Sequence, residues 1–317
     1  MTTTLFMGTA DLARTILQAL LAQTSLRVPA VVTQPDRPRG RQLKLVPSAV
    51  KVLALEHGLT VLQPGKARDP KFIEELRAWQ PELIVVAAYG QILPQGILDL
   101  PRFGCLNVHA SLLPKYRGAA PIQWALLNGD SSTGVTLMKM NAGMDTGDML
   151  RWRGIPIDPA DTGQSLQEKL ARLGAELLVE VIPDYLSGRI QPVPQDDSQA
   201  TYARKITKED GIIRWDQPAL NIWRQIRAFT PWPGASTFAL LDSEKRLLKI
   251  WEAAVVDHPG GPPGQVLQAN REGILVACGQ QALRLLILQR EGKRPLPAAT
   301  FLAGSPLQPG TLLGPAK

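Results

Sequence analysis

The sequence has few of the residues from which metal sites and disulfide frameworks are built. Its 317 residues include two cysteines and three histidines. Two cysteines cannot form a disulfide framework, so a reducing compartment fits and we expect a cytoplasmic protein. The cysteines and histidines show neither a CxxC nor an HxxxH spacing, which predicts that the protein holds no metal ion.

The sequence also lacks the segments that carry a chain to or through a membrane. No apolar run approaches the ~18 residues needed to cross a bilayer. No basic stretch precedes an apolar one at the N-terminus, so we expect no secretory signal. The 27 glycines and 27 prolines are about 17% of the chain, short of the ~25–30% typical of low-complexity sequences. We therefore expect ordinary folded cores and no membrane partner.

The net charge of +7 comes from 35 basic and 28 acidic side chains. It is compatible with a nucleic acid, an anionic cofactor or an acidic surface as partner, and it selects none of them. Residues 1–188 contain 19 basic and 17 acidic side chains, whereas residues 189–317 contain 16 and 11. The smaller, C-terminal part therefore holds most of the excess positive charge.

The N-terminal half alternates apolar strands with amphipathic helices. Strands that are apolar on both faces are typical of parallel sheets covered by helices. We expect Ser165 to cap the last helix, with Glu168 completing a capping box. The pattern predicts an α/β, doubly wound domain over residues 1–188. Its expected strands are 5–7, 31–32, 83–88, 105–108 and 135–140, and its clearest helices are 12–21 and 166–181.

The pattern changes after residue 188. Residues 189–206 begin with a polar, proline-containing, aperiodic stretch, which predicts a linker. In residues 207–317 one expected helix, 219–229, precedes short strands, and their spacing predicts a small β-barrel. We expect the tail after Arg294 to pack without regular structure. The expected strands are 236–241, 247–254, 265–269, 274–277 and 283–288.

Asn107 and His109 lie two positions apart at the end of an expected strand, so their side chains point the same way. Open α/β sheets bind ligands beyond the carboxyl ends of their strands. An amide beside an imidazole suits chemistry at a carbonyl group, because the amide stabilises a developing oxyanion while the imidazole transfers a proton. Ordinary hydrogen bonds within a loop are the alternative, and for this pair alone the more common one.

A carboxylate near His109 would orient the imidazole and stabilise its charged form. Asp145 offers one, because Gly143 and Gly147 bracket it and permit a tight turn. Asp148 is the rival candidate, and a plain Asp/Gly turn is the alternative interpretation. Residues 6–11 lack the GxGxxG pattern and have no acidic residue ~20 positions later, which disfavours a dinucleotide cofactor.

Two basic clusters are candidates for contacts with nucleic-acid phosphates. Prolines and a glycine in residues 34–44 disfavour both helix and strand, so we expect a projecting loop. This loop has one acid, Asp36, and four cations: Arg37, Arg39, Arg41 and Lys44. Solvated surface is the usual alternative for such a run of charge. On the expected helix 219–229, Arg224 and Arg227 share a face opposite Leu220, Trp223 and Ile226, for which an ordinary amphipathic helix is the alternative.

Together these motifs resemble a known family. Asn107-x-His109, the run 111–118 and the turn 143–147 are similar to the 10-formyltetrahydrofolate-dependent formyltransferases. The runs 34–44, 86–94 and 226–234 extend the resemblance over essentially the whole chain, and they resemble the branch that acts on methionyl-tRNA. The resemblance implies a Rossmann-like, doubly wound formyltransferase domain followed by a small OB-like β-barrel.

The resemblance also implies an activity. The formyl group of the co-substrate 10-formyltetrahydrofolate would pass to the α-amino group of methionine on initiator tRNA, in a reaction carried out by a monomer. By the family pattern Asn107 holds the formyl oxygen, His109 stabilises charge and transfers a proton, and Asp145 orients His109 or relays the amine proton. The β-barrel and the basic segment contact tRNA. The folate lies along two runs: Ser111, Leu112, Leu113 and Pro114, and Tyr89, Gly90, Gln91, Ile92 and Leu93.

Two other functions stay open at the level of sequence. Formyltransferases acting on glycinamide ribonucleotide or on amino sugars, and formyltetrahydrofolate hydrolases, would keep the same chemistry. The 129 residues after residue 188 argue against a glycinamide-ribonucleotide formyltransferase, which acts with a single α/β domain. A non-catalytic RNA-binding module would not need Asn107, His109 and Asp145 together.

Overall fold

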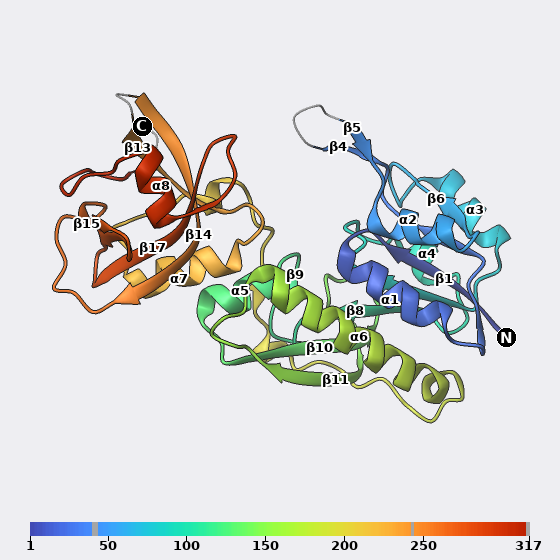
Figure 1. Cartoon of the computed structure of the whole chain (residues 1–317). Helices are drawn as coiled ribbons and strands as arrows, with labels where there is room; N and C mark the ends of the chain where they lie inside the picture. The colour runs from blue at the N-terminus through green and yellow to red at the C-terminus, as the bar shows by residue number, and fades with distance from the viewer. Residues whose placement is uncertain (40–43, 242–243, 315–317) are drawn as a thin grey trace. The chain divides into compact units, whose positions relative to one another are not determined.

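The computed structural model describes residues 1–39, 44–241 and 244–314 (Figure 1). The chain forms two compact units, and the prediction of an α/β part followed by a β-rich part is confirmed. The first unit comprises Met1–Pro121, Ser132–Pro156 and Leu166–Arg204. The second comprises Ile122–Ser131, Ile157–Ser165 and the chain from Lys205 onward.

An eight-stranded sheet forms the centre of the first unit, in the order β11-β10-β8-β7-β1-β3-β6, with β2 beside β1. Its parallel strands are β1 (Thr2–Gly8), β2 (Leu26–Arg27), β3 (Ala30–Val32), β6 (Thr60–Leu62), β7 (Leu83–Ala87) and β8 (Cys105–His109). β10 (Ser132–Lys139) and β11 (Met149–Pro156) are antiparallel to their neighbours. The chain passes from β1 to β3 and β6, then returns to the other side with β7. The direction in which successive strands are added to the sheet therefore reverses between β1 and β7, although the two strands are parallel. Doubly wound sheets bind ligands at such a switch point.

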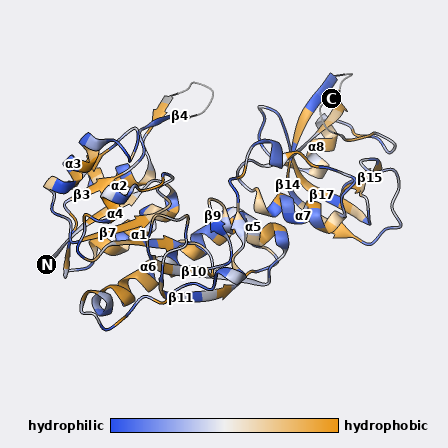
Figure 2. Ribbon diagram, turned by 180° about the vertical axis from the view of Figure 1, so that it is seen from behind, coloured by the Kyte–Doolittle hydropathy of each residue, from blue (hydrophilic) through white to orange (hydrophobic). Residues whose placement is uncertain are grey.

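Helices cover both faces of this sheet, as the sequence predicted. α1 (Asp11–Leu21), α2 (Ala49–Glu56) and α6 (Gly163–Leu186) lie on one face, where Gly174 of α6 approaches Val108 and Val135 of the sheet (Figure 1). α3 (Pro70–Ala78) and α4 (Gln95–Leu98) share a core with the opposite face. All five residues of β7 are buried, and β7 is among the most apolar segments in Figure 2. Burial of both faces explains why this strand is a continuous apolar run.

The cap of α6 differs from the prediction. The amide of Thr162 donates to the Ser165 hydroxyl at 3.0 Å, and the amide of Ser165 donates to the Thr162 hydroxyl at 3.2 Å. These reciprocal bonds form a capping box in which Thr162 is the cap. The prediction that Ser165 caps the helix, with Glu168 as its partner, is therefore wrong by one turn. Thr162 and Ser165 are both residue types that cap helices, and the helix uses the earlier one.

The basic segment contains strands where we expected a loop. β4 (Arg37–Arg39) pairs antiparallel with β5 (Lys44–Val46). We predicted that these residues form neither a helix nor a strand, and that prediction is wrong. Both strands of a two-stranded ribbon are edge strands, and an edge strand tolerates proline where its missing N–H would face solvent. Arg41 lies outside the described residues.

An antiparallel sheet forms the centre of the second unit, in the order β13-β14-β17-β16-β15. Its strands are β13 (Ala235–Leu241), β14 (Glu244–Val256), β15 (Val266–Asn270), β16 (Gly273–Ala277), β17 (Ala282–Arg290) and β18 (Leu296–Pro297), the last beside β17. α7 (Ala219–Ala228) and α8 (Ala298–Gly304) share its core through Ile226 and Phe301. The tail after Arg294 therefore includes regular structure, contrary to the prediction. This short helix between prolines was too brief to show a periodic pattern.

The two edges of this sheet are joined by the segment Gly310–Gly314. On one side the amide of Phe238 in β13 donates to the carbonyl of Gly314 at 2.8 Å. On the other side the amide of Val266 in β15 donates to the carbonyl of Thr311 at 2.8 Å. One extended segment thus satisfies backbone groups of both edge strands, which would otherwise be exposed.

We predict that Gly264→Ala destabilises the second unit more than Gly260→Ala does. A Cβ at Gly264 would lie 2.3 Å from the carbonyl oxygen of Leu313 in the joining segment, whereas one at Gly260 would meet nothing within 4 Å. Both glycines have positive φ, +85° and +95°, so both variants incur the left-handed cost of about 1–2 kcal/mol. We expect the Gly264 variant to lose about 2 kcal/mol more in urea unfolding. Equal losses would show that the close approach at Leu313 does not matter.

Candidate active site

The strand β8 carries two of the predicted site residues. Asn107 and His109 are buried, with 9% and 6% of their surface exposed. Both lie on the face of the sheet opposite α6, because Val108 between them packs on that helix. In the neighbouring strand β10, Met138 pairs with Asn107 and Thr136 pairs with His109.

The carboxylate of Asp145 meets both side chains. Asn107 Nδ2 donates to Asp145 Oδ1 at 3.4 Å, and His109 Nδ1 lies 3.8 Å from Asp145 Oδ2. The structure therefore brings the three predicted catalytic residues together. The rival candidate, Asp148, is exposed.

We expected Gly143 and Gly147 to provide the backbone freedom for the tight turn, but the residue with positive φ is Asp145. Asp145 itself has a φ of +53°, a left-handed conformation that aspartate tolerates better than most residues. Gly147 serves a close approach, because a Cβ there would lie 1.9 Å from the carbonyl oxygen of Lys139. The amide of Gly118 donates to Asp145 Oδ2 at 2.8 Å and fixes the carboxylate.

The hydrogen bonds of His109 determine its tautomer. Nε2 lies 2.9 Å from the carbonyl oxygen of Tyr116. A carbonyl only accepts, so Nε2 carries the hydrogen in the neutral imidazole and Nδ1 has a lone pair. That lone pair faces the Asp145 side of the site. Nδ1 can therefore take a proton, and the carboxylate beside it stabilises the resulting cation.

This arrangement suits acyl transfer. The amide nitrogen of Asn107 carries two hydrogens, and one of them bonds Asp145. The second can bond an oxyanion that forms next to His109. An oxyanion donor and a proton acceptor thus lie on either side of the Asp145 carboxylate, the first hydrogen-bonded to it at 3.4 Å and the second 3.8 Å from it.

The loop after β8, where Ser111–Pro114 were predicted to bind folate, is fixed to β10. The Thr136 hydroxyl donates to the carbonyl of Ser111 at 2.7 Å and accepts from the amide of Leu113 at 3.0 Å. The Ser111 hydroxyl donates to the carbonyl of Lys115 at 2.6 Å. Ser111 and Leu113 are buried, while Leu112 and Pro114 are partly exposed.

The second predicted folate run, Tyr89–Leu93, follows β7 at the switch point of the sheet. The Tyr89 carbonyl accepts from Thr9 Oγ1 at 3.1 Å and from Gln34 Nε2 at 2.8 Å, which fixes the backbone. The Gln91 side chain accepts from the amide of Ala67 at 2.7 Å. Gly90 and Ile92 are exposed, whereas Leu93 is buried. This places exposed backbone of the run beside the carboxyl end of β1.

The Tyr89 side chain belongs to the core. It is 2% exposed and packs among apolar residues, including Leu93 and Ile97. Within the described residues its hydroxyl has no hydrogen-bond partner. Burial raises the pKa of Tyr89 to about 12.

In the basic segment, the single acid is already engaged. Asp36 accepts from Lys51 Nζ at 2.7 Å and from Gln63 Nε2 at 2.8 Å. The hydrogen bond from Lys51, followed by that from Gln63, lowers the pKa of the Asp36 carboxyl. The guanidinium of Arg37 bonds the Gln34 side chain instead. Asp36 therefore does not neutralise Arg37. The backbones of Arg39 and Lys44 lie opposite each other in the hairpin of β4 and β5.

The two arginines of α7 have contacts within the second unit. Arg227 donates to the carbonyls of Asp161 and Asp158, both at 2.8 Å, and its guanidinium lies 4.3 Å from the Trp223 ring centroid. Burial lowers the pKa of this guanidinium. The Arg224 guanidinium lies against Gly129.

Of the three apolar residues expected opposite the arginines of α7, Ile226 is buried, whereas Leu220 is 41% exposed. Beside Ile226 the helix buries Ala219 and Ile222. This stripe has the same helical spacing, so the amphipathic pattern alone did not select between the two.

Two residues outside the predicted set reach the site. The Gly118 amide bonds the Asp145 carboxylate, and the Gln195 side chain bonds the carbonyls of Asp145 and Gly147. Gly118 belongs to the run 111–118, which is part of the family resemblance, so the sequence held a signal for it. Gln195 lies in the segment predicted as a linker, where no periodicity or motif marks it. Through Arg204 this segment belongs to the first unit.

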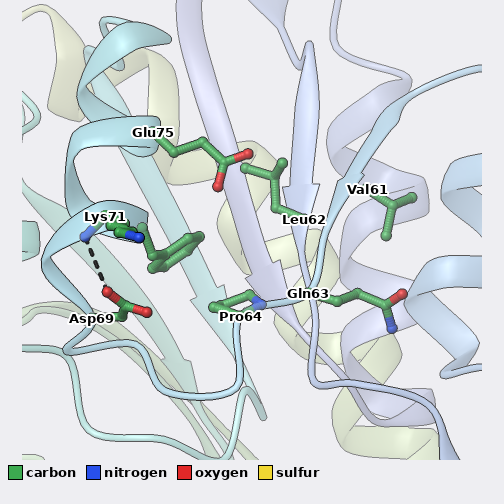
Figure 3. Close-up of a pocket in the computed structure, with 8 residues that line it drawn as sticks. Val61, Leu62, Gln63, Pro64, Asp69, Lys71 and Glu75 are labelled. Atoms are coloured by element: carbon green, nitrogen blue, oxygen red, sulfur yellow. Dashed lines mark hydrogen bonds between the residues drawn. The ribbon is translucent and has the colours of Figure 1, made fainter.

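A hollow of about 310 Å³ lies elsewhere in the first unit, between β6 and the start of α3 (Figure 3). Asp69, Lys71 and Glu75 contribute polar atoms to it beside Leu62 and Phe72. Its strand β6 is four positions from β8 in the sheet, roughly 19 Å at the usual strand spacing. This hollow is therefore separate from Asn107 and His109.

Two classes of feature are absent from the part of the chain that the structure describes. No group of three or more His, Cys, Asp or Glu side chains is placed to hold a metal ion. Among the described helices, none combines the length and apolar character needed to span a membrane.

Comparisons with protein families and curated sequences give matches to both units. The family model described as formyl transferase matches residues 2–182, and the formyl transferase C-terminal domain matches residues 205–306. The methionyl-tRNA formyltransferase of Geobacter sulfurreducens is 51% identical over 98% of this chain and 96% of its own length. That of Caldanaerobacter subterraneus is 50% identical over 97% and 98%.

Solved structures share the fold. An N-formyltransferase from Helicobacter canadensis, solved with folinic acid and dTDP-3-aminofucose, has a TM-score of 0.64 at 18% identity, covering 90% of this chain and 99% of its own. The methionyl-tRNA formyltransferase of Clostridium thermocellum has a TM-score of 0.56 at 18% identity, covering 81% and 94%. At these identities the likeness concerns the fold.

We predict that Tyr89→Phe leaves the free energy of unfolding unchanged or raises it by up to about 1 kcal/mol, because it removes a buried hydroxyl without a partner. Tyr185→Phe is the matched control. Tyr185 is also buried, and its hydroxyl donates to the carbonyl of Phe103 at 2.6 Å. We expect this control to lose about 1 kcal/mol in urea unfolding. A loss for Tyr89→Phe as large as that for Tyr185→Phe would contradict the absence of a partner for the Tyr89 hydroxyl in the described part of the chain.

Proposed function

Because this chain belongs to the formyl transferase family, we propose that it transfers the formyl group of 10-formyltetrahydrofolate to the α-amino group of methionine esterified to initiator tRNA. The product is formylmethionyl-tRNA for translation initiation. Relatives named for this reaction are half identical over nearly the whole chain, which supports the proposal. The observation that carries it in the structure is the meeting of Asn107, His109 and Asp145.

The proposed reaction begins when the amine nitrogen attacks the formyl carbon and a C–N bond forms. The formyl oxygen becomes an oxyanion, which Asn107 Nδ2–H stabilises. The ammonium proton passes to the pair formed by His109 Nδ1 and Asp145. The tetrahedral centre then breaks its bond to the folate nitrogen, which takes up a proton. The products are a formyl amide and tetrahydrofolate.

In this proposal the parts of the chain divide the work. Residues 1–188 carry out the transfer, with folate along Ser111–Pro114 and the Tyr89–Leu93 backbone. Residues 207–317 contact tRNA together with the basic segment, and 189–206 join the two. The 16 basic against 11 acidic side chains after residue 188 favour a polyanionic partner there. The protein acts as a monomer, in the cytoplasm, where translation begins.

The proposal is tested by incubating the full chain with 10-formyltetrahydrofolate and methionylated initiator tRNA. Formylmethionyl-tRNA is the expected product. Parallel reactions offer an amino-sugar nucleotide, glycinamide ribonucleotide or no acceptor. Formylation confined to a small acceptor, release of formate alone, or folate binding without any transfer would overturn the proposal.

We predict that Asn107→Ala lowers kcat by about 10²–10³, the effect of losing one oxyanion donor. His109→Ala and Asp145→Asn should each lower kcat by at least about 10², with the KM for folate changed less than kcat. The matched control for the carboxylate is Asp148→Asn, an exposed aspartate three residues away. Near-normal turnover of any of the three variants would remove that residue from the mechanism.

We predict that replacing Arg37, Arg39 and Arg41 with alanine raises the KM for tRNA and flattens its dependence on salt. The slope of log KM against log salt should fall by about one unit for each phosphate that the protein no longer neutralises. A control variant removes the same charge elsewhere by replacing Arg14, Arg27 and Arg77, which are exposed on the first unit. The pair Arg224→Ala, Arg227→Ala tests α7 in the same titration.

An unchanged slope of log KM against log salt in the variant lacking Arg37, Arg39 and Arg41 would show that the basic segment is solvated surface and does not contact tRNA. Equal changes in the control would assign the effect to net charge.

A further inference from the structure

We propose that Gln195 is a positioning residue for the Asp145 carboxylate. This inference rests on the proposed function and deepens it, since it concerns what holds the proposed catalytic turn. Gln195 comes from the segment 189–206, outside the motifs of the site. Its role follows from four hydrogen bonds made by a single side-chain amide.

The nitrogen of the Gln195 amide holds the turn that contains Asp145. Nε2 donates to the carbonyl oxygen of Asp145 at 2.8 Å and to that of Gly147 at 2.7 Å. An amide nitrogen has two hydrogens, so both are used on this turn. The two carbonyls flank Thr146, and fixing them fixes the backbone from which the carboxylate projects.

The oxygen of the same amide is held by Arg117. Arg117 Nε donates to Gln195 Oε1 at 3.0 Å, and a terminal guanidinium nitrogen donates to it at 2.8 Å. Arginine only donates and backbone carbonyls only accept, so the orientation of the Gln195 amide is determined. All four hydrogen-bonding positions of this amide are therefore occupied within one network.

Arg117 returns the network to the carboxylate. It is 2% exposed, and its charge is paired with Asp197 at 2.6 Å. The next residue, Gly118, donates its amide to Asp145 Oδ2 at 2.8 Å. The pairing of β9 (Arg117–Gly118) with β12 (Tyr202–Ala203) fixes this stretch. Asp145 is thus held at its carboxylate by Gly118 and at its backbone by Gln195, with Arg117 joining the two.

The backbone of Asp145 needs such support. Its φ of +53° costs energy even in an aspartate, which tolerates it better than most residues do, so contacts from the surroundings stabilise it. The bonds from Gln195 hold the carbonyl groups of the turn on both sides of Thr146. Without them, the carboxylate can move away from His109 and Asn107.

The test is Gln195→Glu. A glutamate keeps the size of the side chain and can accept from Arg117, but it loses both donors and sets a carboxylate oxygen beside two carbonyl oxygens. We expect kcat for formyl transfer to fall by about 10- to 100-fold, the scale for displacing a catalytic group by about 1 Å. The KM values for folate and tRNA should stay within about threefold, because the bound substrates keep their contacts.

The matched control is Gln191→Glu, an exposed glutamine of the same segment whose side chain bonds the Gly188 carbonyl at 3.1 Å. It introduces the same charge and should leave kcat within about twofold. Thermal unfolding of both variants shows whether the fold is kept. If Gln195→Glu does not fold, Gln195→Met takes its place, since it removes both donors without adding a charge.

A double-mutant cycle separates positioning from general structure. In an Asp145→Asn background, Gln195→Glu should change the residual kcat by less than about threefold, because its effect acts through the carboxylate. The same fold-change in both backgrounds, or an unchanged kcat in the single variant, would overturn the inference. Absence of formyl transfer by the unmodified protein would instead overturn the proposed function, so the two failures are distinguishable.

Discussion

The site depends on the left-handed backbone of Asp145. β10 ends at Lys139, which pairs with Leu106 at the start of β8. His109 lies three residues further along β8, about 10 Å away at the usual rise per residue. The turn that follows β10 must fold back over the sheet to bring a carboxylate to His109. The φ of +53° at Asp145 and the close approach of Gly147 to the Lys139 carbonyl make that reversal possible.

The order of the strands determines which groups this turn can meet. β8 lies between the parallel β7 and the antiparallel β10, so it is flanked by a strand that ends at the switch point and by the strand that leads into the Asp145 turn. Thr136 in β10 holds the loop after β8, and that loop supplies the Tyr116 carbonyl that sets the His109 tautomer. The tautomer of the imidazole therefore depends on the same strand pairing that positions the carboxylate.

Sequence patterns predicted what local periodicity determines. β7 and α1 follow from continuous or striped apolar residues, and the common direction of Asn107 and His109 follows from a spacing of two. Features that depend on contacts distant in sequence were not predictable in this way. β4 and β5 are two short strands that pair only with each other, and neither is long enough to show an alternating pattern. The segment Gly310–Gly314 bonds β13 and β15, and it too has no alternating pattern of its own. Gln195 had no signal, because a glutamine among polar residues acquires a role only when Arg117 is folded beside it.

Net charge is a poor guide to where a polyanion binds, because the cations of this chain differ in what they already contact. Arg227 uses its donors on the carbonyls of Asp158 and Asp161 and stacks on Trp223, so a phosphate would have to compete with those bonds. Arg117 is buried and paired with Asp197. In the basic segment the situation is reversed, since Lys51 and Gln63 hold Asp36 and remove the one anion that could have neutralised Arg37. Exposed Arg37 is therefore easier to recruit to a phosphate than Arg227 is, although the excess of charge lies in the second half of the sequence.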